Sequence, residues 1–317
     1  MLDGITNTAG IDIGKAFLDV ALHPSGEALR LANDPAGYCT LLAWLQAHDV
    51  ARVGLEASGG YEHGVLVALR ATDLAVALLQ PRQVRAFALY RLRRAKNDRL
   101  DARLIAQCTA ALEAVRAAPD PRFAALAEHL RLIEQIEADL ARLKTRLEAY
   151  REKRLLRWIK AEAGRLERRL KAELLLLAKQ VMVHDDLTHR LALIESVEGV
   201  GRRTALSLLV LMPELGTLSR AQIASLAGLA PFDRDSGAHR GQRRIAGGRG
   251  RVRRALYAAA FPASFRWNAS LIALYKRLRA KGKPHKLALV ACARKLLTFV
   301  NTVVARNAQW QKQPTAG

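Results

Sequence analysis

An apolar repeat in the middle of the chain constrains the fold more than any other feature of the sequence. Between residues 133 and 150, apolar side chains recur at spacings of three and four, which is typical of the core positions of a coiled coil. A strand cannot hold this pattern on one side, because its side chains alternate with a period of two. The pattern therefore predicts a long helix that begins near Ala125. The repeat consists of Ile133, Ile136, Leu140, Leu143, Leu147 and Tyr150.

The repeat loses its register near Arg154, and a second helical pattern then continues to about Leu177. We expect a coiled-coil helical arm over residues 121–190, between an N-terminal domain over 1–120 and a basic, mostly α-helical C-terminal domain over 191–317. The periodicity alone leaves two arrangements open, because the same apolar positions serve either a dimer or a helical subdomain packed on its own chain.

Short apolar segments alternate with helical patterns before the arm. This alternation predicts an α/β domain in which helices cover both faces of a mixed sheet. The expected elements are two strands over 9–23 joined at Gly14-Lys15, a strand at 28–31, a helix at 38–47, a strand at 53–57, a helix ending near 70 and a strand at 74–79.

The charge of the chain is large and unevenly distributed. There are 51 Lys and Arg residues against 29 Asp and Glu, a net charge of +22, and the segment from Leu191 onward holds 22 of the basic residues and 5 of the acidic ones. Such a positive field attracts a polyanion. No stretch approaches the ~20 apolar residues of a membrane span. We therefore expect the C-terminal domain to bind nucleic acid and not a membrane.

The cysteines and the first residues indicate a cytoplasmic protein. Cys39, Cys108 and Cys292 lie far apart and match no zinc-ligand spacing. Residues 1–10 show no secretory signal peptide.

Four carboxylates occupy unusual positions in the N-terminal domain. Asp12 lies between two isoleucines in the first strand, where an unpartnered charge would cost several kcal/mol. Glu56 lies at the end of a strand, at the sheet edge where sites usually form. Asp98 and Asp101 are three residues apart at a helix start and share a face. Each is more often structural, but together they form a plausible oxygen cage for Mg²⁺.

The C-terminal domain carries a candidate nucleophile in a basic segment. Ser236 precedes a glycine and is followed by many arginines, which could stabilise the charge of a phosphate under attack. A serine beside a glycine is usually only part of a turn. Residues 196–205 also resemble a helix-hairpin-helix, whose glycines let backbone amides approach a phosphate.

The order of the four carboxylates resembles that of the DEDD insertion-sequence transposases. The resemblance runs from about Gly10 to Gln107, through GIDIGK, LEASGGY and KNDRLDARLIA. It implies an RNase H-like, RuvC-like fold. Members usually have Lys-Thr before the first Asp of the last pair, and this chain has Lys96-Asn97. The metal ligands that it implies are Asp12, Glu56, Asp98 and Asp101.

Residues 196–303 are similar to the C-terminal domain of the same transposases, through AGLAP, an SG pair, GQRRI and RRALY. The similarity implies that Ser236 is the nucleophile and forms a serine–phosphate link to DNA. Members commonly have Ser-Lys where this chain has Ala246-Gly247, so Arg249 or Arg251 would take over any phosphate contact. The arginines expected to hold nucleic acid are Arg240, Arg243, Arg244, Arg249, Arg251, Arg253 and Arg254.

The resemblance implies a Mg²⁺-dependent DNA recombinase guided by a structured RNA that the element encodes, and a homo-oligomer, dimeric or tetrameric, that assembles through the arm. Three alternatives stay open. They are a RuvC-like Holliday-junction resolvase that uses water as nucleophile, an actin-like sugar kinase, against which the basic C-terminal domain argues, and a nucleic-acid-binding module without activity.

Overall fold

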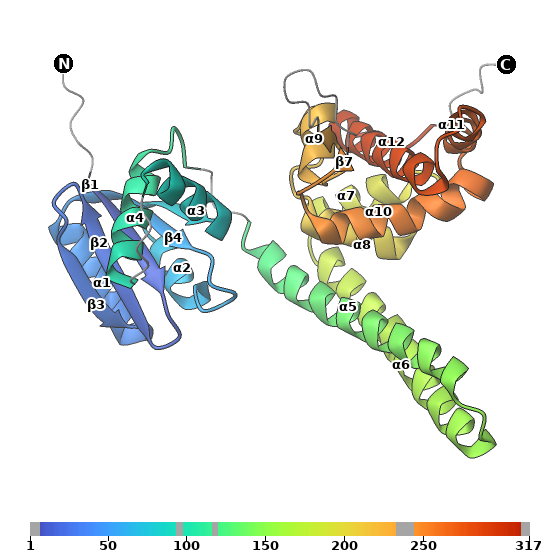
Figure 1. Ribbon diagram of the computed structural model, residues 1–317, viewed down its shortest axis with the longest axis horizontal. Coiled ribbons are helices and arrows are strands. Elements are labelled where there is room, and N and C mark those ends of the chain that lie inside the picture. The colour runs from blue at the N-terminus through green and yellow to red at the C-terminus, as the bar shows by residue number, and fades with distance from the viewer. Residues whose placement is uncertain (1–6, 93–97, 116–119, 233–243, 312–317) are drawn as a thin grey trace. The chain divides into compact units, whose positions relative to one another are not determined.

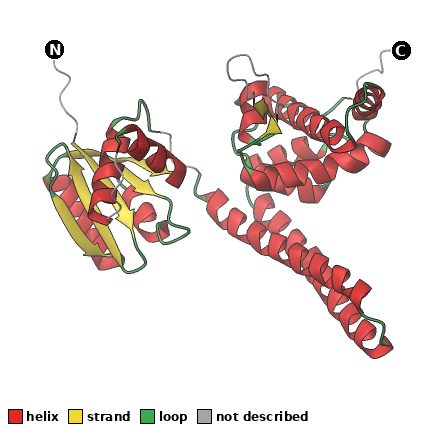
Figure 2. Cartoon of the chain, in the orientation of Figure 1, coloured by secondary structure: helices red, strands yellow, loops and turns green. Residues whose placement is uncertain are grey.

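The computed structural model describes residues 7–92, 98–115, 120–232 and 244–311. The chain divides into two compact units, 1–119 and 120–317 (Figure 1). Figure 2 shows that the large sheet belongs to the first unit, whereas the second unit consists mainly of helices.

The first unit is built on a five-stranded mixed sheet with the strand order β3-β2-β1-β4-β5. The first three strands of the chain are antiparallel neighbours, and β1, β4 and β5 are parallel. This mixed α/β arrangement confirms the expected fold class of the N-terminal domain and fits an RNase H-like fold. The strands are β1 (Asn7–Ile13), β2 (Phe17–His23), β3 (Ala28–Ala32), β4 (Val50–Glu56) and β5 (Ala75–Leu79).

Helices cover both faces of this sheet. On one face, α1 (Pro35–Ala47) and α2 (His63–Arg70) bury a core that includes Ile11 and Leu55 of the strands. On the other face, α3 (Pro81–Tyr90) and α4 (Asp98–Ala110) pack on a second core that includes Leu79. Because strand side chains alternate, odd-numbered positions of β1 and β4 face α1 and α2, and even-numbered positions face α4.

The apolar repeat from Ile133 to Leu143 lies in one half of an antiparallel helical hairpin, whereas Leu147 and Tyr150 come after the end of that helix and belong to the turn. Helix α5 (Arg122–Arg146) and helix α6 (Lys153–Met182) lie side by side in Figure 1 and are joined by a short 3₁₀ helix, Leu147–Ala149. The antiparallel direction follows from cross-helix contacts: Lys144 pairs with Glu167 at 2.9 Å, whereas His129 near the other end of α5 reaches Glu173 at 3.0 Å. The break in register near Arg154 is therefore the turn of the hairpin.

The base of this hairpin belongs to the core of the second unit. Leu130 and Ile133 of α5 and Leu177 of α6 are fully buried there with residues of the C-terminal helices. The C-terminal helices are α7 (Asp185–Glu195), α8 (Arg202–Leu211), α9 (Arg220–Leu226), α10 (Gly250–Pro262), the π-helix η2 (Ala263–Trp267), α11 (Ala269–Ala280) and α12 (His285–Arg306), with a small hairpin of β6 (Pro231–Phe232) and β7 (Arg244–Ile245). Helices α7, α9, α10 and α11 pack against α12, whose apolar residues belong to the core of the unit.

Helix α12 is the one helix in the described part of the chain that is long and apolar enough to cross a membrane. Leu289, Leu296 and Val300 of this helix have no exposed surface. The apolar composition of α12 is thus accounted for by its position in the core.

Candidate active site

Two glycines allow α4 to pack directly on the sheet, close to the candidate carboxylates Asp12 and Glu56. Gly10 of β1 and Gly54 of β4 are paired in register. A Cβ on Gly10 would overlap the backbone of Ala102 and Ala106, and one on Gly54 would overlap the side chain of Thr109. The backbone of α4 therefore rests directly on β1 and crosses toward β4, which no residue larger than glycine would allow.

Asp12 and Glu56 are neighbours at the carboxyl edge of the sheet. Each follows one of these glycines by two residues, so each side chain leaves its strand on the face that α4 covers. Both residues are partly buried, and the Asp12 Oδ1 accepts a hydrogen bond from the backbone N–H of Ile13 at 3.0 Å. Two of the carboxylates predicted from sequence are thus placed on adjacent parallel strands.

The other two carboxylates belong to the start of α4. Asp98 is the first residue of this helix, and its side chain lies outside the described part of the structure. Asp101 is partly buried and directly precedes Ala102, which contacts Gly10. Their helix therefore lies over the strand that carries Asp12.

A complete metal cage is not formed by the described side chains. Among them, no group of three or more His, Cys, Asp and Glu residues is close enough to hold a metal ion. The donors on the α4 face of the sheet are carboxylates, which suit a hard divalent cation.

The sequence analysis missed a fifth acidic residue on this face. Asp19 of β2 lies opposite Asp12 in the antiparallel register and is only 8% exposed. Its two carboxylate oxygens accept hydrogen bonds from Arg30 of β3, with Nε to Oδ1 at 2.8 Å and Nη2 to Oδ2 at 2.7 Å. A row of charged side chains, Arg30, Asp19, Asp12 and Glu56, thus crosses four adjacent strands on the side of α4.

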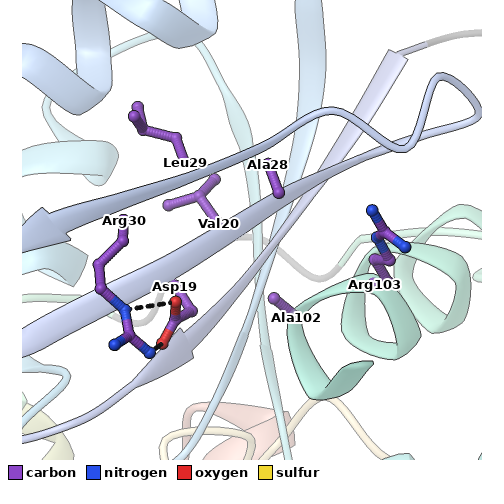
Figure 3. A pocket seen from close by; sticks show the side chains of 7 residues that line it. All are labelled: Asp19, Val20, Ala28, Leu29, Arg30, Ala102 and Arg103. Carbon is purple, nitrogen blue, oxygen red and sulfur yellow. Dashed lines mark hydrogen bonds and ion pairs between the residues drawn. The ribbon is translucent and has the colours of Figure 1, made fainter. Parts of the chain in front are cut away.

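The Asp19–Arg30 pair lines a cavity of about 350 Å³ beneath the start of α4 (Figure 3). On the opposite wall, Arg103 donates from Nη2 to the carbonyl oxygen of Gly26 at 3.0 Å, in the β2–β3 turn. The lining residues are Asp19, Val20, Ala28, Leu29, Arg30, Ala102 and Arg103.

The candidate nucleophile Ser236 lies outside the described residues, as do Arg240 and Arg243. The strands that flank this part of the chain are described: Pro231 pairs with Ile245, and Phe232 pairs with Arg244. Phe232 and Arg244, the described residues on either side of this part of the chain, are therefore neighbours.

Three of the predicted nucleic-acid-binding arginines have partners within the chain. Arg249 donates from both Nη atoms to the Glu214 carboxylate at 2.6 and 2.7 Å, and Arg251 donates from Nε to Glu134 at 2.7 Å. Arg253 donates to the carbonyl oxygen of Gly247 at 2.8 Å. These hydrogen bonds tie the three side chains to other residues of the second unit, and contact of the same arginines with a phosphate stays a prediction. Among the described arginines of the predicted set, Arg244 and Arg254 are exposed.

The segment that resembles a helix-hairpin-helix does connect two helices, α7 and α8. Gly199 in this turn has a φ of 96°, a conformation that favours glycine, and Gly201 is the N-cap of α8. Contact between this turn and a phosphate stays a prediction.

Comparisons with known proteins place both units among transposases. Residues 9–151 match a DEDD transposase model of the IS110 elements, described as transposase, and residues 191–276 match the model described as transposase, IS116/IS110/IS902 family. Pilin gene-inverting proteins of Moraxella bovis and Moraxella lacunata are each 27% identical over 321 residues, covering 96% of this chain and 97% of theirs. An uncharacterized 43.6 kDa protein of insertion element IS110 from Streptomyces coelicolor is 34% identical over 125 residues, 38% of this chain and 30% of that protein.

Proposed function

The chain belongs to the IS110 family of DEDD transposases and is a DNA transposase or recombinase, and we propose that it cuts and rejoins DNA through a covalent link to Ser236. The observation that carries the proposal is the adjacent placement of Asp12 and Glu56 on the sheet edge beside α4, in a chain whose second unit is strongly basic.

We propose that four carboxylates bind a divalent cation, most naturally Mg²⁺. Carboxylate oxygens and retained water are the ligands that Mg²⁺ prefers, and the α4 face supplies carboxylates from two strands and one helix. A bound cation would polarise a phosphoryl oxygen. The residues that would hold it are Asp12, Glu56, Asp98 and Asp101.

In the proposed reaction, the Ser236 Oγ attacks the phosphorus of a phosphodiester and loses its proton. A serine–phosphate bond forms while the bond to one deoxyribose oxygen breaks, and that oxygen leaves as a hydroxyl after taking up a proton. A hydroxyl of another strand end then attacks the same phosphorus and releases the serine. One phosphoester bond replaces another at each step, so no external energy source is required. Exposed arginines such as Arg254 would neutralise the phosphate charge.

The partners of this reaction extend beyond DNA. We propose a structured guide RNA, supported by the family resemblance and by the polyanion attraction of the basic second unit. The relatives described as pilin gene-inverting proteins support DNA rearrangement by inversion as one outcome. A protein that acts on the DNA and RNA of a bacterial element would work in the cytoplasm, and we propose that location.

We also propose that the α5–α6 hairpin mediates assembly. Large apolar side chains of α6 are exposed although the hairpin is already packed, and a second copy would cover them. These side chains are Trp158, Leu175, Leu176 and Met182, with exposures of 61%, 62%, 48% and 56%.

The decisive experiment compares wild type, Ser236→Ala and the control Ser225→Ala, which removes an exposed serine of α9. Wild type and Ser225→Ala are expected to leave a phosphoserine peptide on DNA after protease digestion, and Ser236→Ala is expected to leave none and to exchange no strands. Strand cleavage by Ser236→Ala would instead support the resolvase hypothesis. Restoration of activity when Ser236→Ala and Asp12→Asn proteins are mixed would indicate that one site draws on two copies. Sequencing of RNA that co-purifies with the protein tests the guide.

A further inference from the structure

We infer that an exposed aromatic cluster on the second unit is a platform on which unpaired DNA bases stack. The cluster combines Phe261 at the end of α10, Phe265 and Trp267 in η2, Tyr275 in α11 and His285 at the start of α12; we call it the aromatic platform. It includes none of the residues of the proposed serine or carboxylate chemistry.

Four rings of the aromatic platform contact one another, those of Phe261, Phe265, Tyr275 and His285, and Trp267 adds an exposed ring from the same short helix as Phe265. The ring centroids of Phe261 and Phe265 are 5.3 Å apart, those of Phe265 and Tyr275 are 4.8 Å apart, and the Tyr275 hydroxyl lies 2.7 Å from His285 Nδ1. Nevertheless Phe261, Phe265 and Trp267 keep 51%, 49% and 61% of their surface exposed. Contiguous exposed apolar patches of this kind mark interaction sites in soluble proteins.

The backbone beneath the platform is held firmly. Asn268 is buried, its Oδ1 accepts from the N–H of Leu271 at 3.1 Å, and its Nδ2 donates to the carbonyl oxygen of Glu198 at 3.1 Å. Gly199 provides the space in which Ala263 packs. The exposure of Phe265 and Trp267 is therefore imposed by the fold and does not result from a loose segment.

Charge selects the occupant of the platform. From Ser236 to the last residue the sequence contains no Asp or Glu, and seven exposed basic residues lie between 266 and 286. Proteins hold single-stranded nucleic acid by combining aromatic rings that stack on the bases with a positive surface that follows the phosphate backbone. A second copy of this chain would bring the same positive charges to the platform and would be repelled. The basic residues are Arg266, Lys276, Arg277, Arg279, Lys281, Lys283 and Lys286.

The choice of DNA rests on the assignment of the chain as a DNA recombinase, which must separate strands before it exchanges them. Unpaired bases of an opened duplex would then stack on the platform, and duplex DNA, whose bases stack on one another, would not. The inferred role is to hold the opened strand.

The test measures binding by the full-length protein to a single-stranded oligodeoxynucleotide that carries 2-aminopurine, without added divalent metal. Wild type is expected to quench the base fluorescence on binding. The double variant Phe265→Leu/Trp267→Leu keeps apolar bulk and all charges, so it is expected to lose the quenching and about 10-fold or more of its single-strand affinity, with less than a two-fold change for duplex DNA. The control is Tyr90→Leu, which removes an exposed aromatic ring from the end of α3 in the first unit and should bind as wild type.

A second variant separates charge from stacking. Lys281→Ala/Lys283→Ala is expected to lower the slope of log affinity against log salt by roughly 0.7 per lost phosphate contact and to retain the quenching. The inference would be overturned if Phe265→Leu/Trp267→Leu bound single-stranded DNA as wild type does, if it lost as much affinity for duplex DNA, or if ring-dependent binding of RNA of the same sequence were tighter. A change in the oligomeric state of this variant at equal thermal stability would also overturn it. Because no strand exchange is measured, failure of the serine mechanism would leave these results unaffected.

Discussion

Replacing Gly10 by alanine tests how closely α4 must approach β1 for the carboxylates to act together. The new Cβ would lie 2.8 Å from the Cα of Ala106 and closer still to two other backbone atoms of α4, whereas ordinary contact begins at 3.4 Å. Both partners are backbone, so no side chain can rotate away. We expect α4 to retreat by about 1 Å, at a cost of about 1–3 kcal/mol for overpacking. Because α4 carries Asp98 and Asp101, strand transfer should fall by about 100-fold.

Two measurements separate this displacement from unfolding. Circular dichroism should give a Gly10→Ala spectrum close to that of wild type, while the increase of the melting temperature on adding Mn²⁺ should be lost. The control is Gly164→Ala in α6, where the Cβ would meet only the flexible end of Arg168 at 3.7 Å; alanine should stabilise that helix by about 0.5–1 kcal/mol. Normal strand transfer together with a normal Mn²⁺ response in Gly10→Ala would refute the idea that this close approach sets the site.

Two further predictions concern ion pairs. Arg30→Ala leaves the mostly buried Asp19 carboxylate without the donor of its two hydrogen bonds, so the free energy of unfolding in urea should fall by about 1–3 kcal/mol, and Arg30→Lys should recover only part of it because lysine cannot donate the same paired bonds. Hydrogen bonds from Arg122 lower the pKa of Asp120 and of Asp186 from the ordinary value of 3.8. The stability that these two ion pairs contribute is therefore complete above that pH and is lost as the pH falls through the lowered pKa values. The Tm of wild type should consequently fall more between about pH 5 and about pH 2 than the Tm of Arg122→Ala. An equal fall in both proteins would contradict this linkage.

The elements of the first unit could be predicted well from sequence, because its strands are short apolar segments bounded by turn residues. The boundaries were less accurate: the helix expected from Tyr38 begins at Pro35, where Asp34 caps it by accepting the N–H of Gly37 at 2.8 Å. The arm illustrates a different limit. A period of three and four fixes one buried stripe on α5 but says nothing about what covers it, and within this chain α6 does.

The candidate site, like the fold, could be predicted from sequence only in part. Asp12 could be recognised because it interrupts an apolar strand, and Asp19 interrupts its own strand just as clearly. What separates the two is Arg30, and only the β2–β3 register brings this arginine beside Asp19. The partner of Arg249 was hidden for the same reason, since Glu214 is 35 residues away along the chain. Residue type indicates that a charge needs a partner, and only the fold identifies it.

The α5–α6 hairpin enters and leaves the core of the second unit at the same place, so its length is free to vary. Heptads added in pairs to the two helices at the turn would extend the hairpin by about 10 Å each while Leu130 and Leu177 stay in their packing. In the assembly that we propose, the arm would therefore act as a spacer, whose length insertions or deletions at the tip could change without altering the packing of its base.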